Sequence, residues 1–517
     1  MTTTATECCT RLLSVGRGNE DIAEPLISKL QKFPLESIGS KEWLQQHAAL
    51  ERLSVLLHEE AVNGGPEKTQ RLFCEAGKVS VLIEELITLD VWKEKVLPLL
   101  RGTADLSSVT AYLPVYHEGL LASILETLLF HSAAAHAADA QLPDLVEYCN
   151  RKLQKLLLRK TSTAADFGRR SAALEAAPLV AAKRTPEDLS DLQERQESEA
   201  SFAAEMCALT LLRFIFDNRK SLQMTIMTLM LDQYDVLLTL IALLEHQPWR
   251  RQTSTGEHEV YEEQQYAPAL PAIPVLGSPL LSVLLRLPVS MMLKGIEETW
   301  KTVERGDVRI SKAEAQVWLT IYGLIMDPDC RQRYELTNFR KENLLRLRRH
   351  LNEVLYDQIP PLRDLHRYLE ELSLGCTGSL FTTPKSALLI SVQPEMREHL
   401  LQEHSHEWEA LAATARRHLC SNRTEDQQQA LRGIADVIQA KIEMVIAKCR
   451  RCGRKATKRC SRCRFEAYCS KECQQADWSV HRHTCKPAVA PTAAGGKGGK
   501  EEAGAAEEGA GSHVKGS

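Results

Sequence analysis

The chain has 517 residues, enough for about three domains or for one long array of repeated units. Hydrophobic residues make up 44% and charged residues 26%, the proportions of a globular protein that buries a large core, while aromatic residues make up only 5%. The 64 lysines and arginines against 68 aspartates and glutamates give a formal net charge of −4. This balance excludes a protein that coats nucleic acid or anionic lipid through its overall charge. The first residues lack the basic flank and apolar run of a secretory signal.

Apolar residues recur at helical spacing through most of the chain. One helix is predicted to begin after Ser40, a favourable N-cap, and another to begin at Pro186, where proline suits the first helical turn. No run shows the alternation and turn punctuation of a β-sandwich. We therefore expect a mostly α-helical body over residues 26–447. It forms a long helical array, either an armadillo- or HEAT-like α-solenoid or an irregular helical domain, because no clean repeat is visible.

Two further helices are predicted near the end of the body. One carries Leu344, Leu347, Leu351 and Val354 on one face and stops at the Pro360-Pro361 pair. The other carries Leu431, Ile434, Ile438, Ile442 and Val445 and runs almost into a cluster of cysteines.

Composition marks the segments that we expect to lie outside this helical packing. They are a flexible N-terminus at 1–25, linkers or insertions at 160–186 and 250–292, and a disordered tail at 486–517. The second insertion is proline-rich over 267–292. We expect no membrane span, because prolines interrupt that apolar insertion and Asp232 and Asp235 interrupt the apolar stretch before it.

Cysteine spacing carries the strongest chemical signal. Of fifteen cysteines, eight are scattered over the first 420 residues without ligand spacing, and seven lie between Cys449 and Cys485. The candidate ligands form four pairs: Cys449 and Cys452, Cys460 and Cys463, Cys469 and Cys473, and His481 and Cys485. Zinc takes four nitrogen or sulfur ligands in a tetrahedron, and eight ligands close two sites with no position for a substrate. The sequence therefore predicts two structural zinc ions.

The segment that holds these pairs is basic. Residues 448–486 contain twelve lysines and arginines against three aspartates and glutamates. Basic patches of this kind bind nucleic acid in many proteins, but here aromatic residues are not interleaved with the basic ones and the body shows no second basic element. We therefore expect a protein-binding module and no nucleic-acid partner.

The order of the pairs, together with the run from Tyr468 to Gln474 and the Asp477-Trp478 pair before His481, closely resembles the MYND family of zinc fingers. Ligand spacing alone leaves open whether neighbouring pairs or alternate pairs share a metal. The resemblance implies alternate pairs: Cys449, Cys452, Cys469 and Cys473 for the first zinc, and Cys460, Cys463, His481 and Cys485 for the second. The residues expected to contact a partner are not ligands: Arg462, Arg464, Gln474 and Trp478. Trp478 has a second interpretation, in which it packs between the zinc sites.

The body also resembles a known family, the MYND-containing factors for pre-assembly of axonemal dynein arms. The matching segments are collinear from about residue 30 to 485: Phe33–Leu35, Gln45–His47, Glu84–Ile87, Val91–Lys93, Glu147–Leu153, Leu244–Trp249 and Gln316–Trp318. The insertion at 267–292 and the tail have no counterpart. The resemblance implies a cytoplasmic factor that supports cilium biogenesis in cells with motile cilia, located also at centriolar satellites, at dynein assembly foci or at the ciliary base.

The same resemblance implies a set of partners. They are a leucine-rich-repeat dynein assembly factor, heat-shock chaperones, an immunophilin-type co-chaperone, and axonemal dynein chains as clients. The implied role is that of a scaffold or co-chaperone and not of an enzyme.

Two other classes of protein carry a finger of this kind. A MYND-containing lysine methyltransferase needs a glycine-rich cofactor loop and an Asn-His motif, and the sequence has no Asn-His pair. No phosphate-binding Gly-Lys-Ser/Thr element is present either. A transcriptional corepressor that uses its MYND finger as an adaptor remains the alternative.

Overall fold

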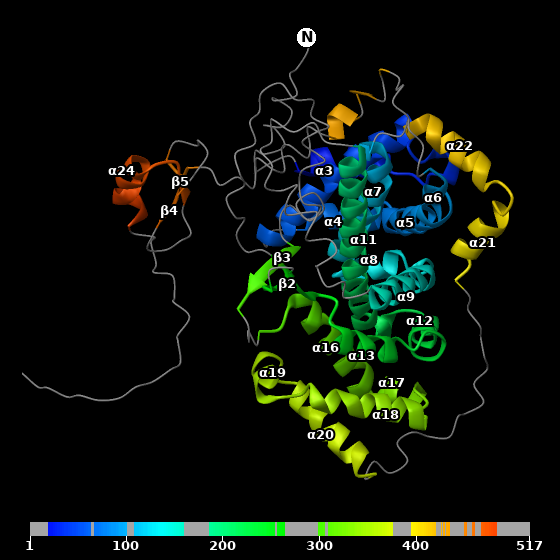
Figure 1. Ribbon diagram of the computed structural model, residues 1–517, viewed down its shortest axis with the longest axis vertical. Coiled ribbons are helices and arrows are strands. Elements are labelled where there is room, and N and C mark those ends of the chain that lie inside the picture. Colours follow the sequence, from blue (N-terminus) through cyan, green and yellow to red (C-terminus); the bar gives the residue numbers. More distant parts are fainter. Residues whose placement is uncertain are drawn as a thin grey trace, which may run out of the picture. The chain divides into compact units, whose positions relative to one another are not determined.

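The protein is described by a computed structural model that divides into two compact units, residues 1–445 and 446–517 (Figure 1). The structure describes residues 19–63, 67–100, 108–159, 186–253, 256–263, 298–304, 309–375, 394–419, 425, 428–429, 431–434, 449–451, 458–460 and 467–482. Within these residues the fold is mostly α-helical, with a small finger after the helical body, as predicted.

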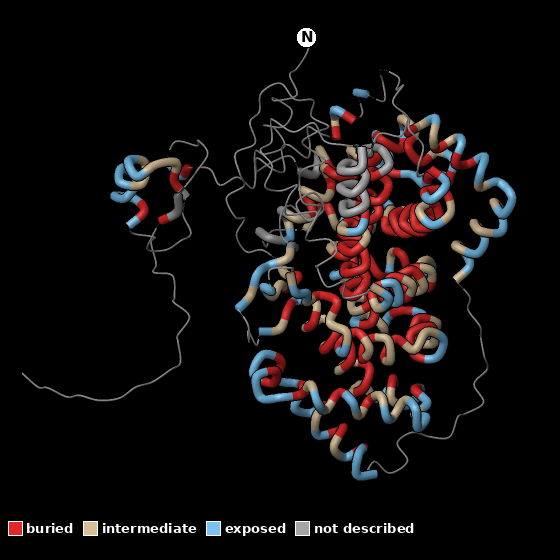
Figure 2. Tube along the Cα trace, viewed as in Figure 1, coloured by how far each residue is buried: buried red, intermediate tan, exposed pale blue. Residues whose placement is uncertain are grey.

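The first half of the body packs around two long helices, α7 and α11. Its helices are α2 (Asn19–Ser28), η1 (Leu35–Ser37), α3 (Lys41–Asn63), α4 (Lys68–Glu75), α5 (Lys78–Lys95), α6 (Leu97–Leu100), α7 (Ser108–Leu129), α8 (Ser132–Ala137), α9 (Leu142–Leu158) and α11 (Pro186–Asp217). Helix α11 packs along α7 and α9, and α3 and α5 also pack on α7. Figure 2 shows buried residues along α11 from Glu197 onward. Ser40 Oγ accepts a hydrogen bond from the Trp43 amide at 3.2 Å, which confirms the predicted N-cap of α3.

The second half continues with shorter helices and one small sheet. These elements are η2 (Arg219–Ser221), α12 (Met224–Thr228), the π-helical η3 (Leu229–Gln233), α13 (Val236–His246), β1 (Arg250–Gln252), β2 (His258–Glu263), β3 (Glu298–Val303), α16 (Lys312–Met326), α17 (Pro328–Arg333), α18 (Asn338–Arg346), η4 (Leu347–Arg349), α19 (Glu353–Gln358), α20 (Leu362–Ser373), α21 (Met396–Glu403) and α22 (Trp408–Leu419).

The last two helices of the body return to its beginning. Helix α21 packs on α5, and α22 packs on α6 and η1 (Figure 1). Arg397 forms an ion pair with Glu94 at 2.6 Å, and buried Leu419 lies against Gly39, where a Cβ atom would come within 2.8 Å of its Cδ2. A solenoid repeat contacts only its neighbours in sequence. Contacts that join the two ends of the body therefore favour the irregular helical domain over the solenoid.

The helical body begins earlier than predicted. Helix α2 starts at Asn19, within the segment 1–25 that was expected to be flexible, and residues 1–18 lie outside the described part. Ala23, Ile27 and Leu30 are all buried and follow one another at helical spacing. That apolar pattern is present in the sequence but is short, and Pro25 lies inside it.

The predicted insertion at 250–292 contains two strands. Strands β1, β2 and β3 form an antiparallel sheet in that order, with Arg250 opposite Val260 and His258 opposite Val303. Tyr261 meets the ring of Phe202 on α11 edge-on at 5.0 Å, so aromatic packing holds the sheet against the body. Residues 264–297 of that insertion, and residues 160–185 of the other predicted linker, lie outside the described residues, as does the tail.

The single helix predicted across Leu344 and Val354 is in fact two helices. The chain leaves α18 through η4, and Asn352 caps the start of α19 by accepting a hydrogen bond from the Leu355 amide at 3.0 Å. Val354 is 42% exposed, so it does not belong to the apolar face on which the prediction placed it. The predicted stop is confirmed, because α19 ends at Gln358 before the two prolines.

In the described part of the chain, no individual helix has both the length and the apolar character needed to cross a membrane. A bent pair, Met224–Gln233 with Val236–His246, meets those two criteria jointly across a 55° bend.

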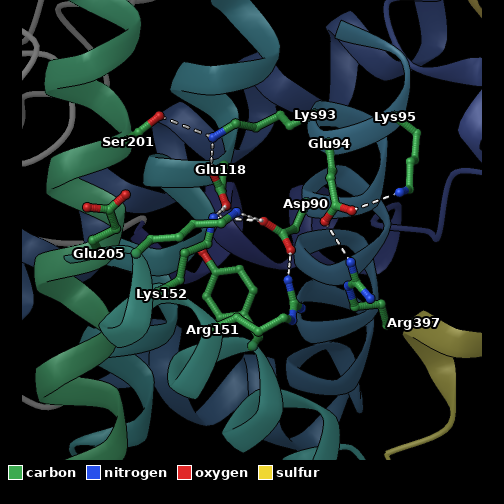
Figure 3. A network of polar contacts seen from close by, with 12 residues as sticks. Asp90, Lys93, Glu94, Lys95, Glu118, Arg151, Lys152, Ser201, Glu205 and Arg397 are labelled. Carbon is green, nitrogen blue, oxygen red and sulfur yellow. Dashed lines mark hydrogen bonds and ion pairs between the residues drawn. The ribbon is translucent and has the colours of Figure 1, made fainter. Parts of the chain in front are cut away.

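A buried network of charged side chains joins four helices (Figure 3). Lys152 on α9 pairs with Asp90 on α5 at 2.7 Å and also with Glu118 on α7, while Lys93 pairs with Glu118 and reaches Ser201 on α11 at 3.4 Å. Arg151 pairs with Asp90 from the rim of the network. Each charge has an opposite charge beside it, which is the condition for burying such groups without a large cost in stability.

Close packing of α16 against α11 gives a first testable prediction. A Cβ atom on Gly323 would lie 2.3 Å from Cε1 of Phe216, which is buried. We expect Gly323→Ala to lower the free energy of unfolding by about 1–3 kcal/mol through overpacking. Gly433→Ala is the matched control, because a Cβ atom there meets nothing within 4 Å. Chemical denaturation measures both variants, and equal stabilities would contradict the expected clash.

Candidate metal centre

The described part of the finger consists of a two-stranded ribbon and one helix. Strand β4 (Lys458–Arg459) pairs antiparallel with β5 (Ala467–Tyr468), and α24 (Lys471–His481) follows. Ser470 caps this helix by accepting a hydrogen bond from the Cys473 amide at 3.3 Å. The cap begins α24 directly after Cys469, so one turn of backbone carries both cysteines of the third pair.

Three sulfur atoms come together at one end of the finger. The Sγ atoms of Cys449, Cys469 and Cys473 all lie within 4.8 Å of one another, and those of Cys469 and Cys473 are 3.5 Å apart. Tetrahedral zinc with Zn–S bonds of about 2.3 Å separates its sulfur ligands by about 3.8 Å. The three thiols therefore fit a zinc ion in spacing and in chemistry. Cys452, the fourth ligand predicted here, lies outside the described residues.

This cluster joins members of the first and third cysteine pairs. Neighbouring pairs sharing a metal would instead place Cys449 beside Cys460. The arrangement of Cys449 with Cys469 and Cys473 is the one expected when alternate pairs share a zinc.

Two members of the second predicted site are described. Cys460, directly after β4, and His481, the last residue of α24, are each 1% exposed. Their predicted companions Cys463 and Cys485 lie outside the described residues. The second ligand set therefore stays a prediction.

The predicted contact residues are only partly placed. Gln474 and Trp478 lie four residues apart on α24, which puts them on one face of that helix. Trp478 is 36% exposed, and its ring meets the ring of His481 at 5.7 Å with an angle of 69°. The tryptophan thus contacts a predicted ligand while presenting part of its surface to solvent. Arg462 and Arg464 lie outside the described residues.

Asp477 makes contacts within the finger to which the sequence interpretation gave no role. Its carboxylate accepts a hydrogen bond from the Tyr468 hydroxyl at 2.7 Å and pairs with Arg450 at 3.2 Å. It lies four residues after Cys473 and four before His481 on α24. That spacing was the available signal, since it places an acidic residue on the ligand-bearing face of the helix.

Comparison with known proteins agrees with this geometry. Residues 449–485 match the MYND finger family. Over 488 residues the chain is 24% identical to the zinc finger MYND domain-containing protein 10 homolog of Drosophila melanogaster. The aligned residues cover 89% of this chain and 96% of that protein. The similarity found in the body segments is thereby confirmed over nearly the whole length. A MYND finger with this cysteine cluster indicates zinc binding.

Other relatives share a smaller part of the chain. Tudor domain-containing protein 1 of Danio rerio is 44% identical over 45 residues, 9% of this chain and 4% of that protein. The MYND-type zinc finger protein samB of Aspergillus fumigatus is 31% identical over 134 residues, 25% of this chain and 20% of that protein. No solved structure matches the chain.

Proposed function

We propose that this protein is a non-enzymatic, cytoplasmic scaffold of the co-chaperone kind for the pre-assembly of axonemal dynein arms in motile cilia. In this role the finger, holding two zinc ions, binds a leucine-rich-repeat assembly factor. The helical body engages heat-shock chaperones, an immunophilin-type co-chaperone and dynein chains as clients. The protein would act in the cytoplasm, including assembly foci, centriolar satellites or the ciliary base.

One observation carries the proposal, namely that the similarity to the Drosophila protein extends over 89% of the chain. A finger alone does not define a role, because the MYND-type zinc finger protein samB matches only 25% of this chain. The body is therefore the part that distinguishes among proteins with this finger.

The buried charges of the body support a scaffold over an enzyme. Lys152 pairs with both Asp90 and Glu118 between helices, and all three side chains are at most 3% exposed. Catalytic groups with altered pKa values are typically found in clefts, where they meet a substrate. These groups instead join α5, α7 and α9, so their chemistry serves the packing of the body.

Affinity capture of the full chain from ciliated cells tests the proposal. We expect dynein heavy chains, chaperones and the leucine-rich-repeat factor to be recovered from the cytoplasmic fraction. The alternative, a MYND-dependent corepressor or adaptor in transcription, has support only from the finger. Recovery of chromatin proteins from nuclei, without dynein chains, would establish that alternative and overturn the proposal.

Charge reversal on the finger tests its docking role. Replacing both Arg462 and Arg464 by Glu should weaken binding of the assembly partner about tenfold or more at low salt, with a shallower or reversed dependence on salt, while zinc content is unchanged. Arg367→Glu on α20 is the control, because that side chain is 73% exposed in the body. The affinity of the parent, the finger variant and the control for the partner is measured at two salt concentrations. Unchanged affinity in the finger variant would move the docking surface to the body.

A further inference from the structure

Three residues of α24 lie on one face of the helix at successive four-residue steps. Cys473 belongs to the sulfur cluster, His481 is predicted to bind the second zinc, and Asp477 lies midway between them. Residues four apart are neighbours on a helix surface. The Asp477 carboxylate therefore lies between the helix positions that serve the two metal sites.

The Asp477 carboxylate also contacts the two segments outside α24 that bring sulfur atoms to the first site. Arg450, which follows Cys449, approaches Asp477 Oδ2 with its Nε at 3.2 Å. Tyr468, which precedes Cys469, donates its hydroxyl to the same oxygen at 2.7 Å. The Asp477 side chain is only 13% exposed, so these contacts are largely shielded from water.

A second contact attaches the segment that follows Cys449 to the same turn of α24. Arg451 Nη1 donates to the Ala476 carbonyl at 2.8 Å. Two consecutive arginines between the first cysteine pair thus both attach to α24 at residues 476 and 477.

Tyr468 extends this connection to the second site. Its side chain is fully buried, and its ring lies 6.1 Å from the ring of His481 with an angle of 63°. The tyrosine therefore contacts Asp477 through its hydroxyl and His481 through its ring. A displacement of β5 at the first site would move the surface against which His481 packs.

We propose that Asp477 is a positioning residue that couples the two zinc sites of the finger, so that filling one site strengthens binding at the other. The inference rests on the proposed pair of zinc ions. Metal at the first site fixes the segments of Cys449 and Cys469, and these hold Asp477 through Arg450 and Tyr468. The fixed helix then presents His481 in its binding position. By linkage, the second zinc favours the first by the same factor.

The test follows zinc release from the full chain in a graded series of a competing chelator. Zinc content per chain is measured by elemental analysis at each equilibrium. In the parent protein we expect both ions to leave over one range of chelator concentration. In Asp477→Asn we expect two steps, separated by roughly 10–100-fold in chelator concentration, the range that loss of an outer-shell partner typically produces.

Two further variants sharpen the comparison. Tyr468→Phe keeps the buried ring against His481 and removes only the hydroxyl, so it should separate the steps by a smaller factor. Glu472→Gln is the control, because it makes the same change of charge at an exposed position of the same helix. It should release zinc as the parent does.

The outcomes are distinct. Release of both ions in one step from Asp477→Asn, at the parent's chelator concentration, would overturn the coupling and leave the two zinc sites standing. An equal effect of Glu472→Gln would also overturn it, since the effect would then follow net charge. If Asp477→Asn retains no zinc, Tyr468→Phe takes its place: release of both ions in one step from that variant, at the parent's chelator concentration, would overturn the coupling. A parent protein with fewer than two zinc ions would fail at the first measurement and overturn the zinc sites together with their coupling.

Discussion

Removing zinc should unfold the finger and leave the helical body intact. The replacement Cys473→Ala takes away one sulfur of the observed cluster, and an excess of chelator takes away the metal itself. Structural zinc contributes ~10–16 kcal/mol to the folding of small fingers, far more than the buried side chains of such a short segment can supply. We therefore expect the finger to lose its structure completely in either case.

The body should hardly change, because the chain divides into two compact units at residues 445 and 446. Helix α24 is the one helix among the described residues of the finger, with 11 residues, so far-ultraviolet circular dichroism should retain nearly all its helical signal. Limited proteolysis should cut the variant within 449–485 and spare the body. Cys74→Ala on α4, half-buried and far from the finger in sequence, controls for loss of a thiol. A loss of most of the helical signal in Cys473→Ala would contradict the independence of the two units.

Spacing made the finger predictable because metal ligands have strict geometric requirements. Pairs with two or three residues between their members identified the candidate ligands, and family resemblance supplied the alternate grouping that the cluster of Cys449, Cys469 and Cys473 matches. The contacts of Asp477 were not predicted, because they require Arg450 and Tyr468 to reach the same carboxylate. Contacts of that kind arise only when three separate segments have folded together.

In the body, helices were predictable where local signals agree. Ser40 combines a good N-cap with an apolar pattern behind it, and α3 begins there. The β1–β2–β3 sheet was missed because its strands are short and are held by aromatic contacts to α11, which the local sequence does not reveal. The return of α21 and α22 to α5 and α6 was not predictable either. It rests on contacts such as Arg397 with Glu94, 303 residues apart in the chain.

The buried charge network of the body should make its stability depend on pH. Burial alone would raise the pKa of Asp90, but the Lys152 ammonium and the Arg151 guanidinium outweigh that effect and hold its pKa well below the usual value. Burial opposes ionisation of Glu118 in the same way, and Lys152 and Lys93 lower its pKa. A carboxyl group with a lowered pKa in the folded state stabilises the protein above its unfolded pKa of about 4.

That contribution is lost as pH falls through the folded pKa of each group, so acid should destabilise the body. Asp90→Asn should lower the free energy of unfolding at neutral pH by about 3–5 kcal/mol, because it leaves excess positive charge buried. The variant should also lose less stability than the parent when the pH is lowered below about 4. Asp364→Asn on α20, where the side chain is 54% exposed, should change stability by no more than about 1 kcal/mol.

A second substitution separates the loss of an attraction from the presence of an unpaired charge. In Asp90→Asn, the ammonium groups of Lys152 and Lys93 share the single carboxylate of Glu118. Adding Lys152→Met removes the surplus charge and leaves Lys93 with Glu118, while Arg151 keeps its pair with Glu147 at 2.6 Å. The double variant should therefore be more stable than Asp90→Asn alone, although it lacks one more ionic group. Urea denaturation of the three proteins at neutral pH measures the difference. A double variant less stable than the single one would show that Lys152 stabilises the body chiefly through Glu118, and that the cost of Asp90→Asn does not come from an unpaired charge.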